Sequence, residues 1–66
     1  MKNTVKEERI EKQLTQVQLA ELVGVSRQTI FSIEINKYVP SVVLSLKLAK
    51  AFGKKVEEIF KLEISD

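Results

Sequence analysis

The sequence predicts a small all-α domain, and three observations lead to this fold class. The chain has 66 residues, which is enough for one domain. It contains only 2 Gly and 1 Pro, so long irregular loops are not expected. Ser, Thr and Gly stand where short amphipathic segments begin and end, and this punctuation predicts five helices joined by tight turns.

Composition excludes several classes of protein. The chain has no Cys and no His, which removes disulfide frameworks, thiolate metal sites, cysteine nucleophiles and the commonest general base. No apolar run approaches the roughly 20 residues that span a bilayer, and the N-terminus lacks an apolar signal core. We therefore expect a soluble, cytoplasmic protein that is not an enzyme and needs no cofactor, metal or small-molecule ligand.

Charge is unevenly distributed along the chain. Eleven Lys and Arg against nine Asp and Glu give a net charge of +2. Between Leu22 and Val56, however, six basic residues face a single acidic residue, Glu34. Such a basic stretch fits a surface that meets a polyanion, although surface lysines also keep small domains soluble. Lys47, Lys50, Lys54 and Lys55 are assigned to this solubilising or long-range steering role.

The first two helices are predicted from their ends. Asn3 is placed as the cap of a first helix that runs to about Gln13. Thr15 and Gln18 have the spacing of a capping box and start a second helix, which Gly24 ends in a left-handed conformation. Its buried stripe is expected to consist of Leu19, Ala20, Leu22 and Val23.

The third helix follows almost at once. Ser26 is its cap, and the short connection through Gly24 and Val25 forces a sharp crossing that is typical of a helix-turn-helix unit. Only Ile30 and Ile33 form an apolar side. The opposite side is wide and mostly uncharged, and it holds Gln28, Phe31 and Ser32, with Thr29 at its edge.

The rest of the chain is expected to form a turn, two helices and a tail. Residues 35–40 make the turn, in which Asn36 tolerates a left-handed conformation. Ser41 caps a fourth helix that ends at Phe52, and its core side is expected to hold Val42, Leu44, Leu48, Ala49 and Phe52.

A last short helix covers roughly Val56 to Phe60. In the tail, residues 61–64 alternate and can form a strand that pairs with residues 1–3.

Short motifs of one known family recur through the chain. They are Leu14-Thr15-Gln16, Leu19-Ala20, Gly24-Val25-Ser26-Arg27-Gln28-Thr29-Ile30, Ile33-Glu34, Pro40-Ser41, Leu48-Ala49, Phe52-Gly53 and Glu58-Ile59-Phe60. In these motifs the chain resembles the phage Cro/repressor-type (XRE) helix-turn-helix family. The resemblance covers residues 3–60, with the helix-turn-helix motif at about residues 15–34 and a C-terminal tail at residues 61–66.

The resemblance implies a five-helix, lambda-repressor-like fold whose third helix reads the major groove of double-stranded DNA. The chain is most similar to small stand-alone members of the family, such as the cytolysin repressor, which act as dimers. We therefore expect a transcriptional regulator, in the simplest case a repressor that binds a palindromic operator as a homodimer. The alternative is a protein-interaction module or antitoxin-like partner that uses the same fold.

Candidate base-reading residues lie on the outer side of the third helix. Gln28 can bond the N6 and N7 atoms of adenine, and Arg27 the O6 and N7 atoms of guanine or a phosphate. Thr29 and Ser32 can bond several base edges. Phe31 has two interpretations, contact with a thymine methyl or sugar, or packing on the following loop.

Phosphate contacts are expected from residues that flank the third helix. Gln16 lies in the first turn of the second helix, where free backbone N–H groups also point toward an anion. Asn36, Lys37 and Tyr38 follow the third helix and can hold the DNA backbone on its other side.

Two further predictions concern structure. Arg9 and Glu34 fall at the inner edges of their helices, where an unpaired charge is costly, so we expect a buried salt bridge between them; members of the family commonly pair these positions. Glu8 stands where the family usually has Leu. Apolar residues outside the core stripes predict a dimer interface that includes Val39, Val43, Leu62 and Ile64.

Overall fold

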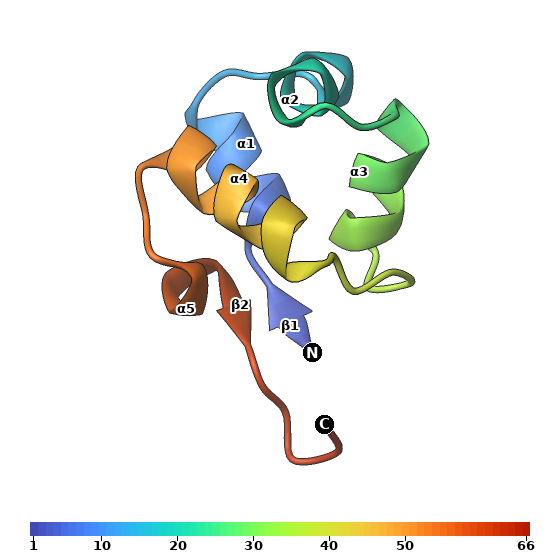
Figure 1. Ribbon diagram of the computed structural model, residues 1–66, viewed down its shortest axis with the longest axis vertical. Coiled ribbons are helices and arrows are strands. Elements are labelled where there is room, and N and C mark those ends of the chain that lie inside the picture. Colours follow the sequence, from blue (N-terminus) through green and yellow to red (C-terminus); the bar gives the residue numbers. More distant parts are fainter.

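The computed structural model describes residues 1–66 and contains five helices and two short strands (Figure 1). The elements are β1 (Lys2–Asn3), α1 (Val5–Glu11), α2 (Gln16–Val23), α3 (Arg27–Glu34), α4 (Val42–Phe52), α5 (Val56–Ile59) and β2 (Phe60–Lys61). The predicted all-α class and the number of helices are confirmed. None of the five helices has the length and the apolar character that a membrane span requires.

The ends of the central helices follow the predicted capping residues. The Thr15 side chain accepts a hydrogen bond from the Gln18 N–H, and the Gln18 side chain accepts one from the Thr15 N–H, which completes the capping box. Ser26 and Ser41 cap α3 and α4, where each serine side chain accepts a hydrogen bond from the backbone N–H three residues later. Gly24 ends α2 at a φ of 75°, in the left-handed region that favours glycine.

The start and end of α1 were predicted wrongly. Asn3 lies in β1, and Thr4 occupies the N-cap position without a side-chain cap. The Asn3 carboxamide oxygen does accept a hydrogen bond from the Val5 N–H, but Asn3 lies one residue before the N-cap position. The helix ends at Glu11, because Gln13 turns the chain with a φ of 58°.

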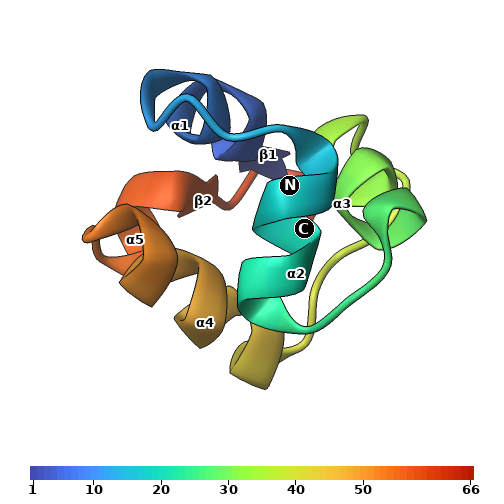
Figure 2. The same ribbon diagram turned by 90° about the horizontal axis from the view of Figure 1, so that it is seen from above.

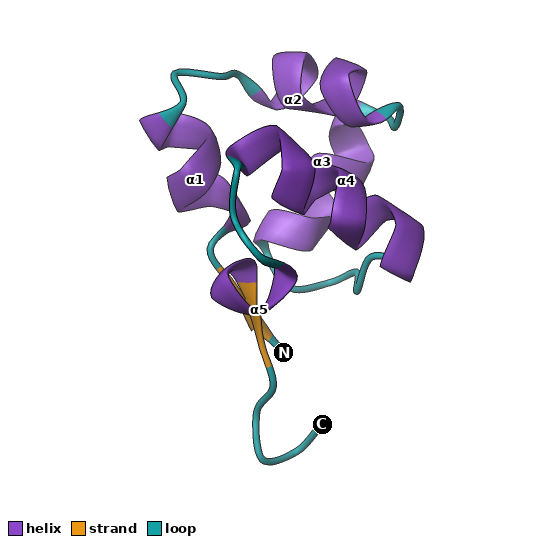
Figure 3. Cartoon of the chain, turned by 60° about the vertical axis from the view of Figure 1, so that its left-hand side comes forward, coloured by secondary structure: helices purple, strands orange, loops and turns teal.

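The two strands form a small antiparallel sheet that closes the domain beside α5 (Figure 3). Lys2 pairs with Lys61 and Asn3 with Phe60. The predicted pairing of the chain ends is confirmed, but the strand begins earlier than predicted. Phe60 therefore belongs to β2 and not to α5. Its backbone is extended, and its side chain is buried in the core.

The core is one cluster contributed by all five helices and β2. Its members are Val5, Leu19, Ala20, Val23, Ile30, Ile33, Leu44, Leu48, Ala49, Phe52, Ile59 and Phe60. Two predicted core residues are exposed, Leu22 at 64% and Val42 at 76%. Leu22 faces away from the α3 and α4 helices that cover the other side of α2, and Val42 lies in the first turn of α4, beyond the last core layer.

Glu8 is a charged residue on the core side of α1. It is 8% exposed, and the Lys54 ammonium donates to its Oε2 at 2.8 Å. Lys54 therefore does more than the solubilising role assigned to it. The pair joins α1 to the connection between α4 and α5.

The helices are arranged so that α3 lies at one side of the domain. Figures 1 and 2 show α2 and α3 together, with α5 at the opposite side. The outer side of α3 is therefore not covered by any other helix. Both chain ends lie near the sheet (Figure 1).

Candidate nucleic-acid interface

The outer side of α3 is presented by the tight turn that precedes it. Only residues 24–26 separate α2 from α3, and the Val25 N–H donates to the Ala20 carbonyl oxygen at 3.0 Å. Ser26 Oγ accepts from the Thr29 N–H at 3.2 Å, and the two hydroxyl groups also lie 3.0 Å apart. The turn thus fixes the first turn of α3, from which Arg27 and Gln28 project.

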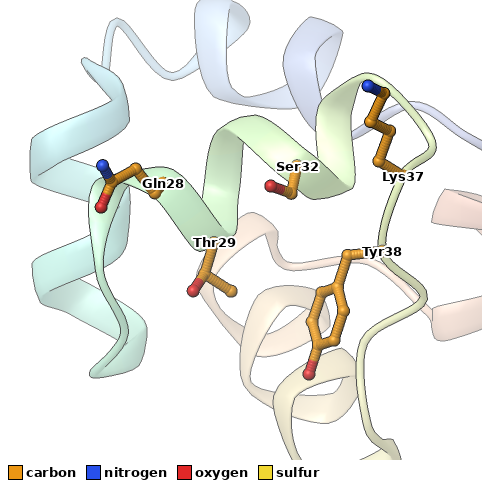
Figure 4. A pocket seen from close by; sticks show the side chains of 5 residues that line it. All are labelled: Gln28, Thr29, Ser32, Lys37 and Tyr38. Atoms are coloured by element: carbon orange, nitrogen blue, oxygen red, sulfur yellow. The ribbon is translucent and has the colours of Figure 1, made fainter.

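A shallow hollow of about 340 Å³ lies between α3 and the loop after it. Its lining consists of Gln28, Thr29, Ser32, Lys37 and Tyr38. Figure 4 shows the first three projecting from α3, with the last two coming from the loop. The structure therefore brings three predicted base-reading residues and two predicted phosphate contacts to one surface, which carries hydrogen-bonding groups and no acidic side chain.

The loop that carries Lys37 is held by local and distant hydrogen bonds. Asn36 adopts a φ of 62°, as predicted, and the Lys37 N–H donates to the Ser32 carbonyl oxygen at 2.9 Å. Asn3 Nδ2 donates to the Ile33 carbonyl oxygen at 2.9 Å and to Asn36 Oδ1 at 3.0 Å. This role of Asn3 was missed, because only the sheet brings it to the end of α3.

Arg27 and Gln16 meet beside α3, between its first and last residues. The Arg27 Nη1 donates to Gln16 Oε1 at 2.9 Å, and Gln16 Nε2 donates to Glu34 Oε1 at 3.0 Å. Arg27 is exposed and Gln16 is half-buried. A predicted base-reading residue and a predicted phosphate contact are therefore bonded to each other in the free protein.

Arg9 and Glu34 form an ion pair. Arg9 Nε lies 2.7 Å from Glu34 Oε2, and Arg9 Nη2 lies 3.4 Å from Oε1. The remaining Arg9 nitrogen, Nη1, donates to the Leu14 carbonyl oxygen at 2.9 Å. The side chains are only 12% and 3% exposed, so the pair ties α1 to the last turn of α3 inside the domain.

The four residues predicted for a dimer interface do not line a single hollow. Val39 lines an apolar hollow of about 420 Å³ beside β2, whereas Val43 lines a different hollow between α4 and the turn after α2. Leu62 and Ile64 are exposed on the tail. Phe31 is 45% exposed on α3.

These features define a class of protein. A helix that follows a tight turn, stands uncovered at one side of the domain and carries uncharged hydrogen-bonding groups is the reading element of a helix-turn-helix DNA-binding domain.

Comparison with known proteins identifies the family. Residues 5–59 match the profile of the helix-turn-helix family. The chain is 52% identical over 63 residues to an uncharacterized HTH-type transcriptional regulator of Bacillus subtilis and 54% identical over 63 residues to one of Methanocaldococcus jannaschii, and in both cases the match covers 96% of each chain. The protein therefore belongs to the XRE-type helix-turn-helix family of DNA-binding transcriptional regulators, which are not enzymes.

A solved structure supports the same assignment. The fold is similar to that of the restriction-modification controller protein C.AhdI from Aeromonas hydrophila, with a TM-score of 0.78 and 36% sequence identity over 85% of each chain. The predicted fold and family resemblance are thus confirmed.

Proposed function

We propose that this regulator is a repressor that binds a palindromic operator as a homodimer and occludes a promoter. The observation that carries the proposal is the hollow formed by α3 and the following loop, where residues suited to bases and to phosphates stand side by side. The outer side of an ordinary surface helix carries mainly Lys and Glu, whereas this side of α3 carries mostly uncharged hydrogen-bonding groups.

Base reading is assigned to the side chains on α3. Gln28 is the principal reader, since its amide matches the donor and acceptor of adenine in the major groove. Arg27 reads guanine, and Thr29 and Ser32 bond neighbouring base edges. The position of α3 at an open side of the domain leaves room for DNA in front of it (Figure 2).

Phosphate binding is assigned to groups on both sides of α3. Gln16 serves the strand near the start of α2, where backbone N–H groups are unpaired within the helix. Asn36, Lys37 and Tyr38 serve the other strand. These contacts set the register of the protein on the duplex and carry no sequence information themselves.

Two copies are required for a palindromic operator. Apolar side chains beside β2 lie at the end of the domain away from α2 (Figure 1). They offer a surface for an isologous contact between two copies. Such a dimer would place its two α3 helices about 34 Å apart, which is one turn of DNA. Val39, Leu62 and Ile64 belong to this end, and Val43 lies closer to the DNA-facing side.

Selection of bound sequences from a random duplex pool tests the proposal. We expect a two-fold symmetric consensus from the wild-type protein. Gln28→Ala should cost about 1–3 kcal/mol of binding free energy per half-site and relax the preference at one base pair. Binding without sequence preference would overturn the proposal and favour a protein-interaction module.

Lys37→Ala is the matched control for that experiment. It should weaken binding to all sequences alike and leave the consensus unchanged. The slope of log affinity against log salt should become shallower by about one unit per subunit, because one phosphate contact is lost. A change in consensus with Lys37→Ala, or none with Gln28→Ala, would contradict this assignment of the reading surface.

A further inference from the structure

Phe31 is an aromatic side chain that the folded chain leaves open on the outer side of α3. It is 45% exposed, and it belongs neither to the core cluster nor to the partly buried apolar residues packed against that cluster. In an α-helix, Phe31 lies about 100° from the buried Ile30 and about 160° from the buried Ile33. Its side chain therefore points away from the core.

Packing on the loop after α3 does not account for this ring. The hollows of about 340 Å³ and about 290 Å³ that Tyr38 lines both include Thr29, and neither includes Phe31. Around the helix, Phe31 and Thr29 lie on opposite sides of Gln28. Phe31 is therefore on the side of Gln28 away from Tyr38, and the loop leaves its exposure unexplained.

The ring is continuous with the surface to which base reading is assigned. Gln28 is exposed about one turn before Phe31, and Ile35, which is 44% exposed, lies about one turn after it. The Ile35 N–H donates to the Phe31 carbonyl oxygen at 3.1 Å, so helical backbone places these two apolar side chains on one side of α3. An apolar strip thus stands beside a hydrogen-bonding amide.

One group in the major groove of DNA suits an apolar ring in this place. Base edges there present mostly hydrogen-bonding atoms, and the C5 methyl group of thymine is the apolar feature that distinguishes them. Phe31 follows Gln28 by three residues, which is about 4.5 Å along the helix axis, compared with about 3.4 Å per base pair along DNA. The two side chains should therefore reach neighbouring base pairs.

We infer that Phe31 is a specificity-determining residue, whose ring contacts the C5 methyl group of a pyrimidine within two base pairs of the one that Gln28 reads. The inference rests on the proposed function, because that function places the outer side of α3 in the major groove. Thymine and 5-methylcytosine carry this methyl group at the same place. Binding should therefore depend on the methyl group itself, separately from the hydrogen bonds of either base.

The methyl group can be changed in DNA without changing any hydrogen-bonding atom. In one arm of the experiment, each thymine of the selected operator is replaced in turn by uracil. At the position that Phe31 contacts, wild-type affinity should fall about fourfold per half-site, as for about 0.8 kcal/mol per buried CH₂ group. In the second arm, that position carries cytosine or 5-methylcytosine, and the methylated duplex should bind about fourfold more tightly per half-site.

The two arms identify the source of the methyl group. A loss with uracil assigns it to the operator's own thymine, and a gain with 5-methylcytosine extends the contact to methylated DNA. Contact of the ring with a sugar would make the affinity insensitive to the methyl group in both arms. That result would overturn the inference. Failure of the wild-type protein to select any consensus would instead overturn the proposed function.

Phe31→Ser tests whether the ring is responsible. This variant should bind the thymine and uracil operators equally at that position. Gln28→Ala is the matched control: it should weaken binding at its own base pair and keep the fourfold methyl effect, because the amide contacts N6 and N7 of adenine. A methyl effect that Phe31→Ser retains, or that Gln28→Ala abolishes, would contradict the assignment to Phe31.

A measurement on the wild-type complex does not depend on any variant being folded. NMR spectra of the protein bound to its operator should show a nuclear Overhauser contact between the Phe31 ring protons and a thymine methyl group. The contact should disappear when uracil replaces that thymine. A Phe31 ring that contacts only protein protons or sugar protons in the complex would rule out methyl reading by this residue.

Discussion

The Arg9–Glu34 pair lies where a single charge would be strongly unfavourable. Both side chains are almost removed from water, at 12% and 3% exposure. Glu34 regains hydrogen bonds from the Arg9 guanidinium and from Gln16, and Arg9 also donates to a backbone carbonyl. With its partners in place, the buried carboxylate is compensated, but either partner alone would be left with little to replace its hydration.

Removal of one partner should therefore destabilise the protein more than removal of both. We expect Arg9→Met or Glu34→Met to lower the free energy of unfolding by about 3–5 kcal/mol, because each leaves an uncompensated charge. The Arg9→Met/Glu34→Met double variant should be clearly more stable than the sum of the single variants predicts. Denaturant unfolding of the four proteins gives the coupling free energy. A coupling of zero would show that the two side chains do not stabilise each other.

Glu8 and Lys54 join two elements that are far apart in the chain. The buried carboxylate on α1 accepts from Lys54, which follows the left-handed Gly53 at the end of α4. The hydrogen bond that Lys54 donates to Glu8, opposed in part by desolvation, raises the pKa of Lys54 above its ordinary value of 10.5. The contact thereby holds α1 against the connection that leads into α5.

The raised pKa makes the contact sensitive to alkaline pH. Folded Lys54 keeps its proton at pH values where the unfolded chain loses it, so the stabilisation is complete below the unfolded pKa. It disappears as the pH rises through the higher folded pKa. The wild-type protein should therefore lose stability relative to Glu8→Leu as the pH rises above the ordinary lysine pKa of 10.5.

Glu8→Leu is an informative reference for that measurement. Leucine suits the apolar surroundings of α1 and leaves Lys54 free to extend into water. The free energy of unfolding of Glu8→Leu and of the wild-type protein is measured with denaturant at each pH. The difference between the two values cancels the titration of groups elsewhere. A difference that does not change with pH would contradict the proposed coupling between Lys54 and Glu8.

Several of the apolar side chains that the single chain leaves exposed lie beside β2 and on the tail. The hollow of about 420 Å³ at this end is lined by Met1, Val39, Pro40, Val42, Ser45, Leu46, Val56 and Phe60. Leu62 and Ile64 extend beyond it on the tail. In so small a domain, burial of these residues in a second copy would add substantially to the apolar area removed from water.

Leu46 and Leu22 provide a matched test of the dimer. Both are exposed leucines on helices, at 57% and 64%, but only Leu46 lines the hollow beside β2. We expect the wild-type protein to sediment as a dimer at tens of micromolar, Leu46→Glu as a monomer, and Leu22→Glu as a dimer. A wild-type monomer that binds its operator as a monomer would rule out this assembly.

Local interactions explain what the sequence by itself determined. Capping boxes, serine caps and left-handed glycines act over three or four residues, so the boundaries of α2, α3 and α4 could be predicted without knowledge of the packing. The pattern of α3 likewise predicted which side is buried at Ile30 and Ile33 and which side is open for DNA.

The tertiary structure decided the contacts between residues that are distant in the sequence. Glu8 and Lys54 are 46 positions apart, Asn3 and Ile33 are 30 apart, and Gln16 and Glu34 are 18 apart. No local pattern distinguishes such residues from ordinary caps or solvated charges. The free energy of each contact depends on where the packed core places its two ends, and only the folded chain brings those ends within hydrogen-bonding distance.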